Sequence, residues 1–410
     1  MIPLNRRQTL DLASLALLAC VLGIAACEKP YVETLQLSAE QGSAQPHLAS
    51  SAHGEVVLSW LTTREHETTL YFSTLEADGW SDPAKVASGS DWFVNWADFP
   101  SVQPITENLW AAHWLVKNAE PIFAYDVAVS LSHDGGLNWG PPITPHNDGT
   151  PTEHGFATLF ALEDQPALIW LDGRQMAAGH GEASAGPMTL RGALLHTDQQ
   201  AAATQILDDR VCDCCQTDVA VSASGPIAVY RNRSEHEIRD IYVSRMEQGV
   251  WRAGRAVATD NWKILGCPVN GPAIDAQGEQ AAVAWFTAGA GGSRVRVAWS
   301  DDAGLTFSDP FDIDTEPAIG RVDVALLSET EAVVSWMRRG ANSQGEIVVR
   351  RVSSAGILGD VQVVAETTGG RPSGFPQMIH SDGYLIFAWT NTSAEVVQTA
   401  RLSIHRWLDG

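Results

Sequence analysis

The stretch Val56-Val57-Leu58-Ser59-Trp60 is a short apolar run that ends in an aromatic residue, and it decides the fold because it recurs. The further copies are Trp110–Trp114, Ala167–Trp170, Ile227–Tyr230, Ala282–Trp285, Val333–Trp336 and Ile386–Trp389. The final aromatics stand at positions 60, 114, 170, 230, 285, 336 and 389, at intervals of 51 to 60 residues. A repeat of about 50 residues built from short strands is typical of one blade of a β-propeller. The spacing therefore predicts seven blades.

The predicted fold is all-β, with seven four-stranded antiparallel blades in a single domain over residues 27–410. The expected blades lie near residues 41–91, 92–149, 150–209, 210–262, 263–316, 317–367 and 368–410. The last repeat is one strand short, whereas the strand-like segment 31–38 is left over before the first blade. Because an open sheet edge leaves backbone groups unpaired, we expect this N-terminal segment to complete the seventh blade and close the ring.

Two turns share a pattern of Ser, Asp, Gly and an aromatic residue, at Ser132–Trp139 and Ser300–Phe307. In such a turn Asp accepts backbone N–H groups and Gly takes a left-handed conformation. These segments resemble the Asp-boxes (BNR repeats) of the sialidase-like β-propeller family. In that family the box is a structural hairpin, so the resemblance implies no catalytic role for Asp134 and Asp302. Sialidases have six blades, so a count of seven argues against sialidase activity.

The first 27 residues predict an export signal. Arg6 and Arg7 make the N-terminal region positively charged. The apolar run Leu12–Leu22 that follows is short for a segment that spans a bilayer. The ending Ile24-Ala25-Ala26-Cys27 resembles the lipobox of bacterial lipoproteins, which implies a signal peptide over residues 1–26 and lipidation of Cys27. We expect a lipid anchor in the cell envelope. The outer membrane is favoured because the residue after Cys27 is Glu28, and not the Asp that usually retains such lipoproteins in the inner membrane. The choice between the general and the twin-arginine export route stays open.

The charge of the chain excludes one class of partner. It has 26 basic and 49 acidic residues and a formal net charge of −23. Proteins that bind nucleic acids need a surplus of positive charge to neutralise phosphates. We therefore expect no nucleic-acid partner.

Arginines nevertheless gather in the loops that should line one face of the propeller. These loops precede the first strand or follow the repeated aromatic of a blade, and four of their arginines are candidate ligand-binding residues: Arg174, Arg231, Arg321 and Arg371. Arginine binds a carboxylate or phosphate group with two parallel hydrogen bonds. The pattern predicts that this face of the propeller, which we call the mouth, binds an anionic small molecule, a glycan or an envelope protein. Ordinary loop polarity is the alternative interpretation.

The sialidase resemblance also implies possible catalytic residues. That family uses three arginines, a Tyr nucleophile assisted by Glu, and an Asp acid. Tyr230 and Glu235 are the candidate pair here, and Asp98 or Asp172 could serve as the acid. Tyr230 also occupies the repeated aromatic position, which fits a core residue. Because the family's Arg-Ile-Pro motif is absent, binding is favoured over catalysis, and an exo-acting glycoside hydrolase is the alternative.

Four cysteines remain beyond the predicted signal peptide and Cys27. Cys212, Cys214 and Cys215 precede the fourth blade, and Cys267 precedes the fifth, so equivalent loops of neighbouring blades should bring them together. An even number in an oxidising compartment favours disulfides. A thiolate site for copper or zinc is the alternative, in an envelope assembly or metal-handling factor. His146, Glu153 and His154 precede the third blade and could add ligands.

Overall fold

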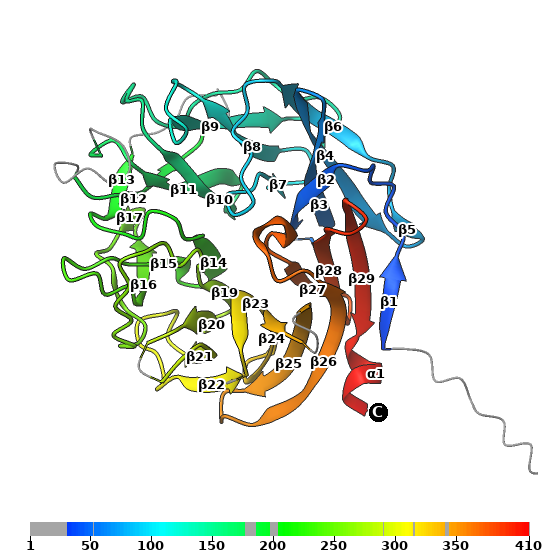
Figure 1. Cartoon of the computed structure of the whole chain (residues 1–410), viewed down its shortest axis with the longest axis vertical. Coiled ribbons are helices and arrows are strands. Elements are labelled where there is room, and N and C mark those ends of the chain that lie inside the picture. The colour runs from blue at the N-terminus through cyan, green and yellow to red at the C-terminus, as the bar shows by residue number, and fades with distance from the viewer. Residues whose placement is uncertain are drawn as a thin grey trace, which may run out of the picture.

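The computed structural model describes residues 31–51, 53–176, 186–196, 204–289, 291–314, 316–340 and 344–409. The predicted signal peptide and Cys27 lie outside the described residues. Seven antiparallel sheets surround a central axis, as Figure 1 shows, so the predicted seven-bladed propeller is confirmed.

The first four blades follow one another along the chain. Blade one consists of β2 (Ser43–Ser50), β3 (Val56–Arg64), β4 (Glu67–Glu76), β5 (Gly79–Trp80) and β6 (Ala84–Gly89). Blade two consists of β7 (Ser101–Pro104), β8 (Trp110–Lys117) and β9 (Tyr125–Ser132), and an isolated bridge joins Val129 to Ile143. Blade three consists of β10 (His154–Leu162), β11 (Gln165–Asp172), β12 (Thr189–Leu194) and β13 (Gln205–Asp208). Blade four consists of β14 (Asp218–Ser222), β15 (Gly225–Arg231), β16 (Ile241–Glu247), β17 (Val250–Trp251) and β18 (Arg255–Ala256).

The last three blades complete the ring. Blade five consists of β19 (Ala273–Gln277), β20 (Gln280–Thr287), β21 (Arg294–Ser300) and β22 (Phe311–Asp314). Blade six consists of β23 (Ala318–Ser328), β24 (Glu331–Arg339), β25 (Gly345–Ser353) and β26 (Leu358–Thr367). Blade seven consists of β27 (Gln377–Ser381), β28 (Tyr384–Asn391), β29 (Val396–Ser403) and β1 (Val32–Leu35). The short helices η2 (Arg371–Ser373) and α1 (Ile404–Asp409) flank blade seven in sequence, and no helix of the described residues could span a membrane.

Ring closure follows the prediction. Strand β1 pairs antiparallel with β29, with Val32 opposite Leu402 and Leu35 opposite Thr399, and Figure 1 shows the two strands side by side. The first and last parts of the chain therefore share one sheet. This pairing covers the edge of β29 that would otherwise expose unpaired backbone groups.

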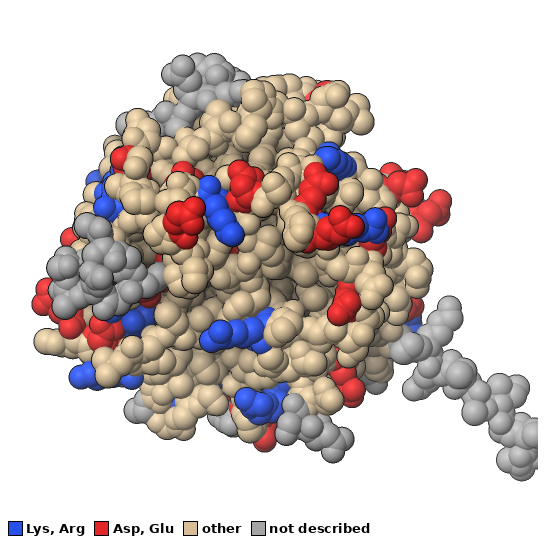
Figure 2. Space-filling model, turned by 45° about the horizontal axis from the view of Figure 1, so that its top comes forward, with Lys and Arg blue, Asp and Glu red and all other residues tan. Residues whose placement is uncertain are grey.

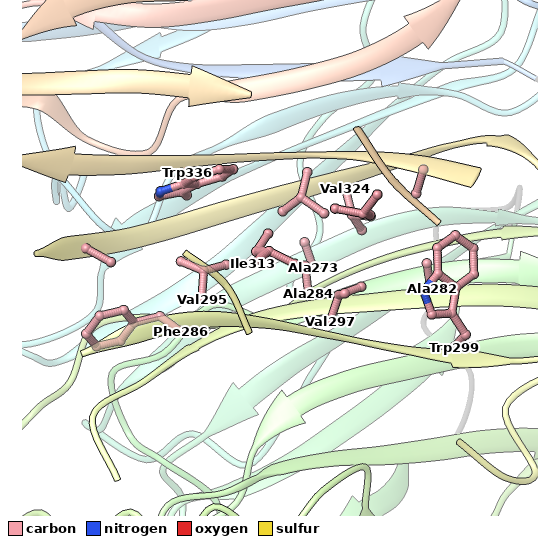
Figure 3. Close-up of a cluster of buried hydrophobic side chains, with 14 of the residues drawn as sticks. Ala273, Ala282, Ala284, Phe286, Val295, Val297, Trp299, Ile313, Val324 and Trp336 are labelled. Atoms are coloured by element: carbon pink, nitrogen blue, oxygen red, sulfur yellow. The ribbon is translucent and has the colours of Figure 1, made fainter. Parts of the chain in front are cut away.

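The core lies between neighbouring blades, where the repeated aromatics pack. Trp60, Trp170, Trp285 and Trp336 are among the largest fully buried side chains. Figure 3 shows the boundary between blades five and six, where side chains of β20 and β21 meet Val324 and Trp336. The second strand of a blade is buried on both faces, which explains why its sequence is a continuous apolar run rather than an alternating one.

The two Asp turns have matching hydrogen bonds. Ser132 Oγ donates to Asp134 Oδ1 over 2.8 Å, and Ser300 Oγ donates to Asp302 Oδ1 over 2.8 Å. Each Asp also accepts the backbone N–H group four residues later, at 2.8 Å in both turns. These contacts give both carboxylates a structural role within their hairpins.

Candidate functional site

The central axis of the propeller holds a cavity of about 700 Å³. Its lining includes Asp98, Gln216, Asp218, Asp275 and Asp323. The last three carboxylates are engaged with the fold: each accepts a backbone N–H from the next blade, donated by Ile274, Leu326 and Met378 respectively. The innermost strands are thus joined by side chains rather than by a continuous sheet.

Two of the predicted ligand-binding arginines are part of the scaffold. Arg231 is 1% exposed and donates to the backbone carbonyls of Asn270, Arg239 and Phe286. Arg321 is 6% exposed, and its guanidinium donates to Ser373 Oγ and to the carbonyls of residues 370 and 374. Their donors therefore hold loops in place, and a structural role replaces the expected ligand contact.

The other two arginines lie nearer the surface. Arg174 donates to both oxygens of Asp172, at 2.6 Å each, and its Nη2 lies 3.1 Å from Asp148 Oδ2. Arg371 is exposed at the start of η2. Figure 2 shows acidic and basic side chains interspersed on the face it draws, without a continuous basic patch. Of the four predicted arginines, Arg371 is exposed, whereas Arg174 is half-buried and already paired with two carboxylates.

Tyr230 and Glu235 do not form the predicted pair. Tyr230 is 1% exposed, and its hydroxyl donates to Asp208 Oδ2 over 2.7 Å. Glu235 lies on an exposed loop. Equivalent tryptophans make the same kind of contact: Trp285 donates to Asp260 and Trp336 to Asp314. Tyr230 is thus a variant of the repeated core aromatic, and this placement accounts for it without catalysis.

Asp98 has a different environment. It is 3% exposed, accepts the backbone N–H of Phe156 at Oδ1, and lies 3.1 Å from the Tyr125 hydroxyl, which also lies 2.7 Å from Glu153 Oε1. Burial, together with the nearby charge of Glu153, raises the pKa of Asp98 to about 7. The predicted acid therefore does belong to a buried acid–tyrosine–acid cluster, but with Tyr125 in place of Tyr230.

The four cysteines meet at the loops that precede blades four and five. Cys212 Sγ lies 2.8 Å from Cys215 Sγ and 3.7 Å from Cys214 Sγ, and the sulfur atoms of Cys214 and Cys267 lie within 4.8 Å of each other. We call these four residues the thiol site. All four are free thiols in the described chain, so the expected disulfide is not formed in this structure.

Arg239 supplies positive charge to the thiol site. Its Nη1 lies 3.2 Å from Cys212 Sγ and 3.4 Å from Asp213 Oδ1. Burial disfavours ionisation of Cys212, but hydrogen bonds from Cys214 and Cys215 and the charge of Arg239 outweigh it and lower the pKa of Cys212 well below its usual range. A thiolate is the form of cysteine that acts as a nucleophile or a metal ligand.

The spacing of the sulfur atoms of Cys212, Cys214 and Cys215 fits a metal ion with modest adjustment. Zinc–sulfur bonds of about 2.3 Å in a tetrahedron place sulfur atoms about 3.8 Å apart. The distance of 3.7 Å between Cys212 and Cys214 matches this edge. The distance of 2.8 Å between Cys212 and Cys215 lies between that edge and the S–S bond of about 2.05 Å, so either ligation or oxidation needs a shift of about 1 Å.

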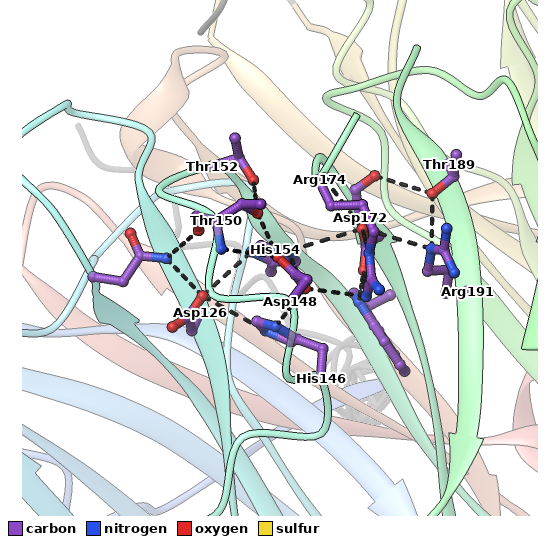
Figure 4. Close-up of polar contacts among 12 residues, drawn as sticks. Asp126, His146, Asp148, Thr150, Thr152, His154, Asp172, Arg174, Thr189 and Arg191 are labelled. Atoms are coloured by element: carbon purple, nitrogen blue, oxygen red, sulfur yellow. Dashed lines mark hydrogen bonds and ion pairs between the residues drawn. The ribbon is translucent and has the colours of Figure 1, made fainter. Parts of the chain in front are cut away.

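A second polar cluster lies between blades two and three (Figure 4). His146 and His154 stack with ring centroids 3.8 Å apart, between Asp126 on one edge and Asp148 on the other. Burial and the neighbouring His154 lower the pKa of His146 to about 4. Burial acts in the same direction on His154, but the surrounding carboxylates outweigh it and raise the pKa of His154. Asp172 lies beside this cluster, held by Arg174.

Sequence reasoning identified the histidines but missed their partners. Asp126 is the second residue of β9 of blade two, whereas Asp148 lies in the loop before β10 of blade three. Neither residue belongs to a recognisable motif. Arg239 was not among the four candidate arginines, and its contact with Cys212 is what distinguishes it. The spacing of blades could have suggested these neighbours, but not the direction of their side chains.

The chain matches no known protein family and no curated protein. Similar solved structures include the polysaccharide lyase Uly1, with a TM-score of 0.51 and 7% identity over 86% of this chain and 88% of that one. They also include a protein of unknown function from Dyadobacter fermentans, with a TM-score of 0.47 and 13% identity over 91% of this chain and 98% of that one. A third is the NanB sialidase from Streptococcus pneumoniae, with a TM-score of 0.46 and 8% identity over 91% of this chain and 94% of that one. At these identities the likeness shows the fold alone, that of a β-propeller.

Proposed function

We propose that this chain is an exported, lipid-anchored β-propeller that binds a thiophilic metal ion, Cu(I) or Zn(II), at the thiol site. The observation that carries the proposal is the group of Cys212, Cys214 and Cys215, with Cys267 from the loop of the next blade within 4.8 Å of Cys214. Soft thiolate ligands select Cu(I) and zinc over hard cations. Copper or zinc would be held by the thiolates of these four residues, which such soft ions prefer to the nearby carboxylate of Asp213.

The surroundings of the thiols support this chemistry. Cys212 and Cys215 are buried, Cys214 is half-buried and Cys267 is exposed. The exposed thiol is accessible to an arriving ion, and the buried ones would shield it from water and oxidants. The positive charge of Arg239 offsets part of the negative charge that several thiolates accumulate.

The predicted anchor sets where such a site would act. Lipidation of Cys27 would place the propeller in the cell envelope, where metal ions arrive from outside and thiols meet oxidants. An envelope protein with this site would take up a metal ion or pass it to a partner. The anchor and the site are independent parts of the proposal, and each has its own test.

The test is metal titration of purified chain 28–410 under reducing, anaerobic conditions, in competition with chromophoric Cu(I) and Zn(II) chelators. We expect tight binding of one ion at the thiol site and a loss of affinity of at least about 100-fold in Cys214→Ser, equivalent to about 2.7 kcal/mol. Glu235→Gln, on a neighbouring exposed loop, is the control and should bind like the wild type. Cu(I) affinity that is unchanged by Cys214→Ser would refute the proposal.

A second candidate function rests on Asp98. An acid with a pKa of about 7 is suited to proton transfer near neutral pH, and Asp98 lines the central cavity. Known structures with a similar fold include proteins described as a sialidase and as a polysaccharide lyase. The alternative is therefore a glycan-cleaving enzyme, with Arg371 available to an anionic sugar. Turnover of sialosides or uronate-containing polysaccharides that Asp98→Asn abolishes and Glu235→Gln leaves intact would support it.

A further inference from the structure

The histidine cluster between blades two and three has the features of a second metal site. Its residues come from three places: Asp126 from the start of β9, His146 and Asp148 from the following loop, and His154 from the start of β10. Figure 4 shows both imidazole rings between the two carboxylates. Neither carboxylate lies within two residues of a cysteine, and the cluster shares no residue with the thiol site.

One edge of the stacked rings faces Asp126. His154 Nδ1 lies 3.3 Å and His146 Nε2 lies 3.6 Å from Asp126 Oδ1. The side chains of His154 and His146 are 0% and 3% exposed, and neither nitrogen makes a hydrogen bond to a described residue. Two buried imidazole nitrogens and a carboxylate oxygen thus lie within 4.8 Å of one another, in a grouping that suits a metal ion.

The opposite edge faces Asp148. His146 Nδ1 lies 3.2 Å and His154 Nε2 lies 3.3 Å from the same oxygen, Asp148 Oδ2. Asp148 is held by the backbone N–H of Thr150, at 3.0 Å, and by Arg174. His146 Nδ1 makes a hydrogen bond to Asp148 on this edge. With a metal ion at the Asp126 edge, the imidazole protons would lie on the Asp148 edge, as in carboxylate–histidine–metal arrangements.

Among the described residues, the ion-pair partners of Asp126 are the two histidines, whereas Asp148 also has an arginine. Asp148 and Asp172 both contact Arg174, and Asp172 also has Arg191 Nε at 3.6 Å. Asp126 has no Arg or Lys partner among the ion pairs of the described residues, and its nearest donor is the Asn118 amide at 2.6 Å. The Asp126 side chain is 28% exposed, so this edge is open to solvent.

We propose that Asp126 Oδ1, His146 Nε2 and His154 Nδ1 bind a divalent ion of borderline softness, such as Zn(II), with Asp148 as the positioning residue. Bonds of about 2.0–2.1 Å in a tetrahedron place ligand atoms about 3.3–3.4 Å apart, close to the 3.3 and 3.6 Å observed. Because the stacked rings direct their lone pairs nearly parallel, one ring must turn about its Cβ–Cγ bond to converge on the ion. Three protein ligands leave a fourth position for water.

The test separates this site from the thiol site. Zn(II) is titrated into a variant with Ser at positions 212, 214, 215 and 267, in competition with a chromophoric chelator. We expect one bound ion per chain, an affinity at least about 10-fold weaker in Asp126→Asn, and a loss of about 10- to 100-fold in Asp148→Asn. His133→Ala, an exposed histidine in the turn of the first Asp pattern, is the control and should change nothing.

A second measurement guards against a four-serine variant that does not fold. The wild-type chain should bind two zinc ions and His146→Ala/Asp126→Asn should bind one, with its thiol-site affinity unchanged. Absence of zinc from the folded four-serine variant, or an affinity that Asp126→Asn leaves unaltered, would overturn the inference. A wild-type stoichiometry of one that depends only on the cysteines would also overturn it, while leaving the proposed thiol site intact.

Discussion

Asp323 Oδ2 accepts a hydrogen bond of 2.7 Å from the backbone N–H of Met378, and this contact joins the innermost strands of blades six and seven. Burial, opposed by this hydrogen bond but aided by the charge of Asp218, raises the pKa of Asp323 to about 8. The folded chain therefore keeps a proton that the unfolded chain releases at a much lower pH. Burial raises the pKa of Asp218 to about 6 in the same way.

The first prediction is a loss of stability as pH rises. Between the ordinary Asp value of 3.8 and about 8, the folded state binds the proton of Asp323 and the unfolded state does not, so the free energy of unfolding falls with pH. Asp323→Asn should remove up to about 1.4 kcal/mol per pH unit from this slope. Urea unfolding at several pH values from 5 to 8 measures it. Asp309→Asn, at an exposed site, should keep the wild-type slope, and equal slopes in both variants would contradict the assignment.

The second prediction concerns Tyr230 as a core residue. Tyr230→Phe removes the donor to Asp208 Oδ2, which then keeps only the amide of Asn232 at 3.0 Å. We expect a loss of about 1–3 kcal/mol in the free energy of unfolding, because the half-buried carboxylate of Asp208 loses a hydrogen bond from a buried hydroxyl. Glu235→Gln should cost nothing. If Tyr230→Phe instead abolishes an activity at unchanged stability, the structural interpretation is wrong.

The third prediction tests ring closure. Removal of residues 31–37 deletes β1, exposes the edge of β29 and loses the buried side chain of Leu35. Burial of one leucine contributes about 1.5–3 kcal/mol, so the melting temperature should fall by several degrees. The exposed edge should also promote self-association, which size-exclusion chromatography detects. Leu37→Ala in the full chain serves as a milder comparison, and a truncated chain as stable as the wild type would show that the ring closes without β1.

The fourth prediction concerns the anchor. Cys27→Ala should abolish lipid labelling in a Gram-negative host and move the chain from the membrane fraction to the soluble fraction. Cys20→Ala, within the apolar run, is the matched control and should stay membrane-bound. A Cys27→Ala chain that still carries labelled lipid would remove the basis for an envelope anchor.

The fold could be predicted because the repeated aromatics carry a direct physical signal. Trp285 and Trp336 fill equivalent spaces between blades, so the period of packing appears in the sequence as a period of residues. The same equivalence predicted that Cys267 would approach Cys214. Residue positions that are set by the repeat could therefore be predicted without a structure.

The direction in which long side chains point could not be predicted from the sequence. Arg231 and Arg371 were both expected in loops of one face, yet Arg231 ends β15 and donates to buried carbonyls, whereas Arg371 is exposed. Loop position does not determine whether an arginine meets a ligand or the backbone. Likewise, Tyr230 was paired with Glu235 by proximity in sequence, whereas its partner Asp208 belongs to the preceding blade.

The central claim is that the thiol site binds a soft metal ion, and X-ray absorption spectroscopy tests it most directly. The four sulfur atoms would give the ion a scattering shell of sulfur alone. For the chain loaded with one equivalent of Cu(I) or Zn(II), we predict only sulfur neighbours, at about 2.3 Å for zinc, and the loss of this shell in Cys214→Ser. A first shell of nitrogen and oxygen, or no stoichiometric metal in a chain whose four thiols are reduced, would contradict the account.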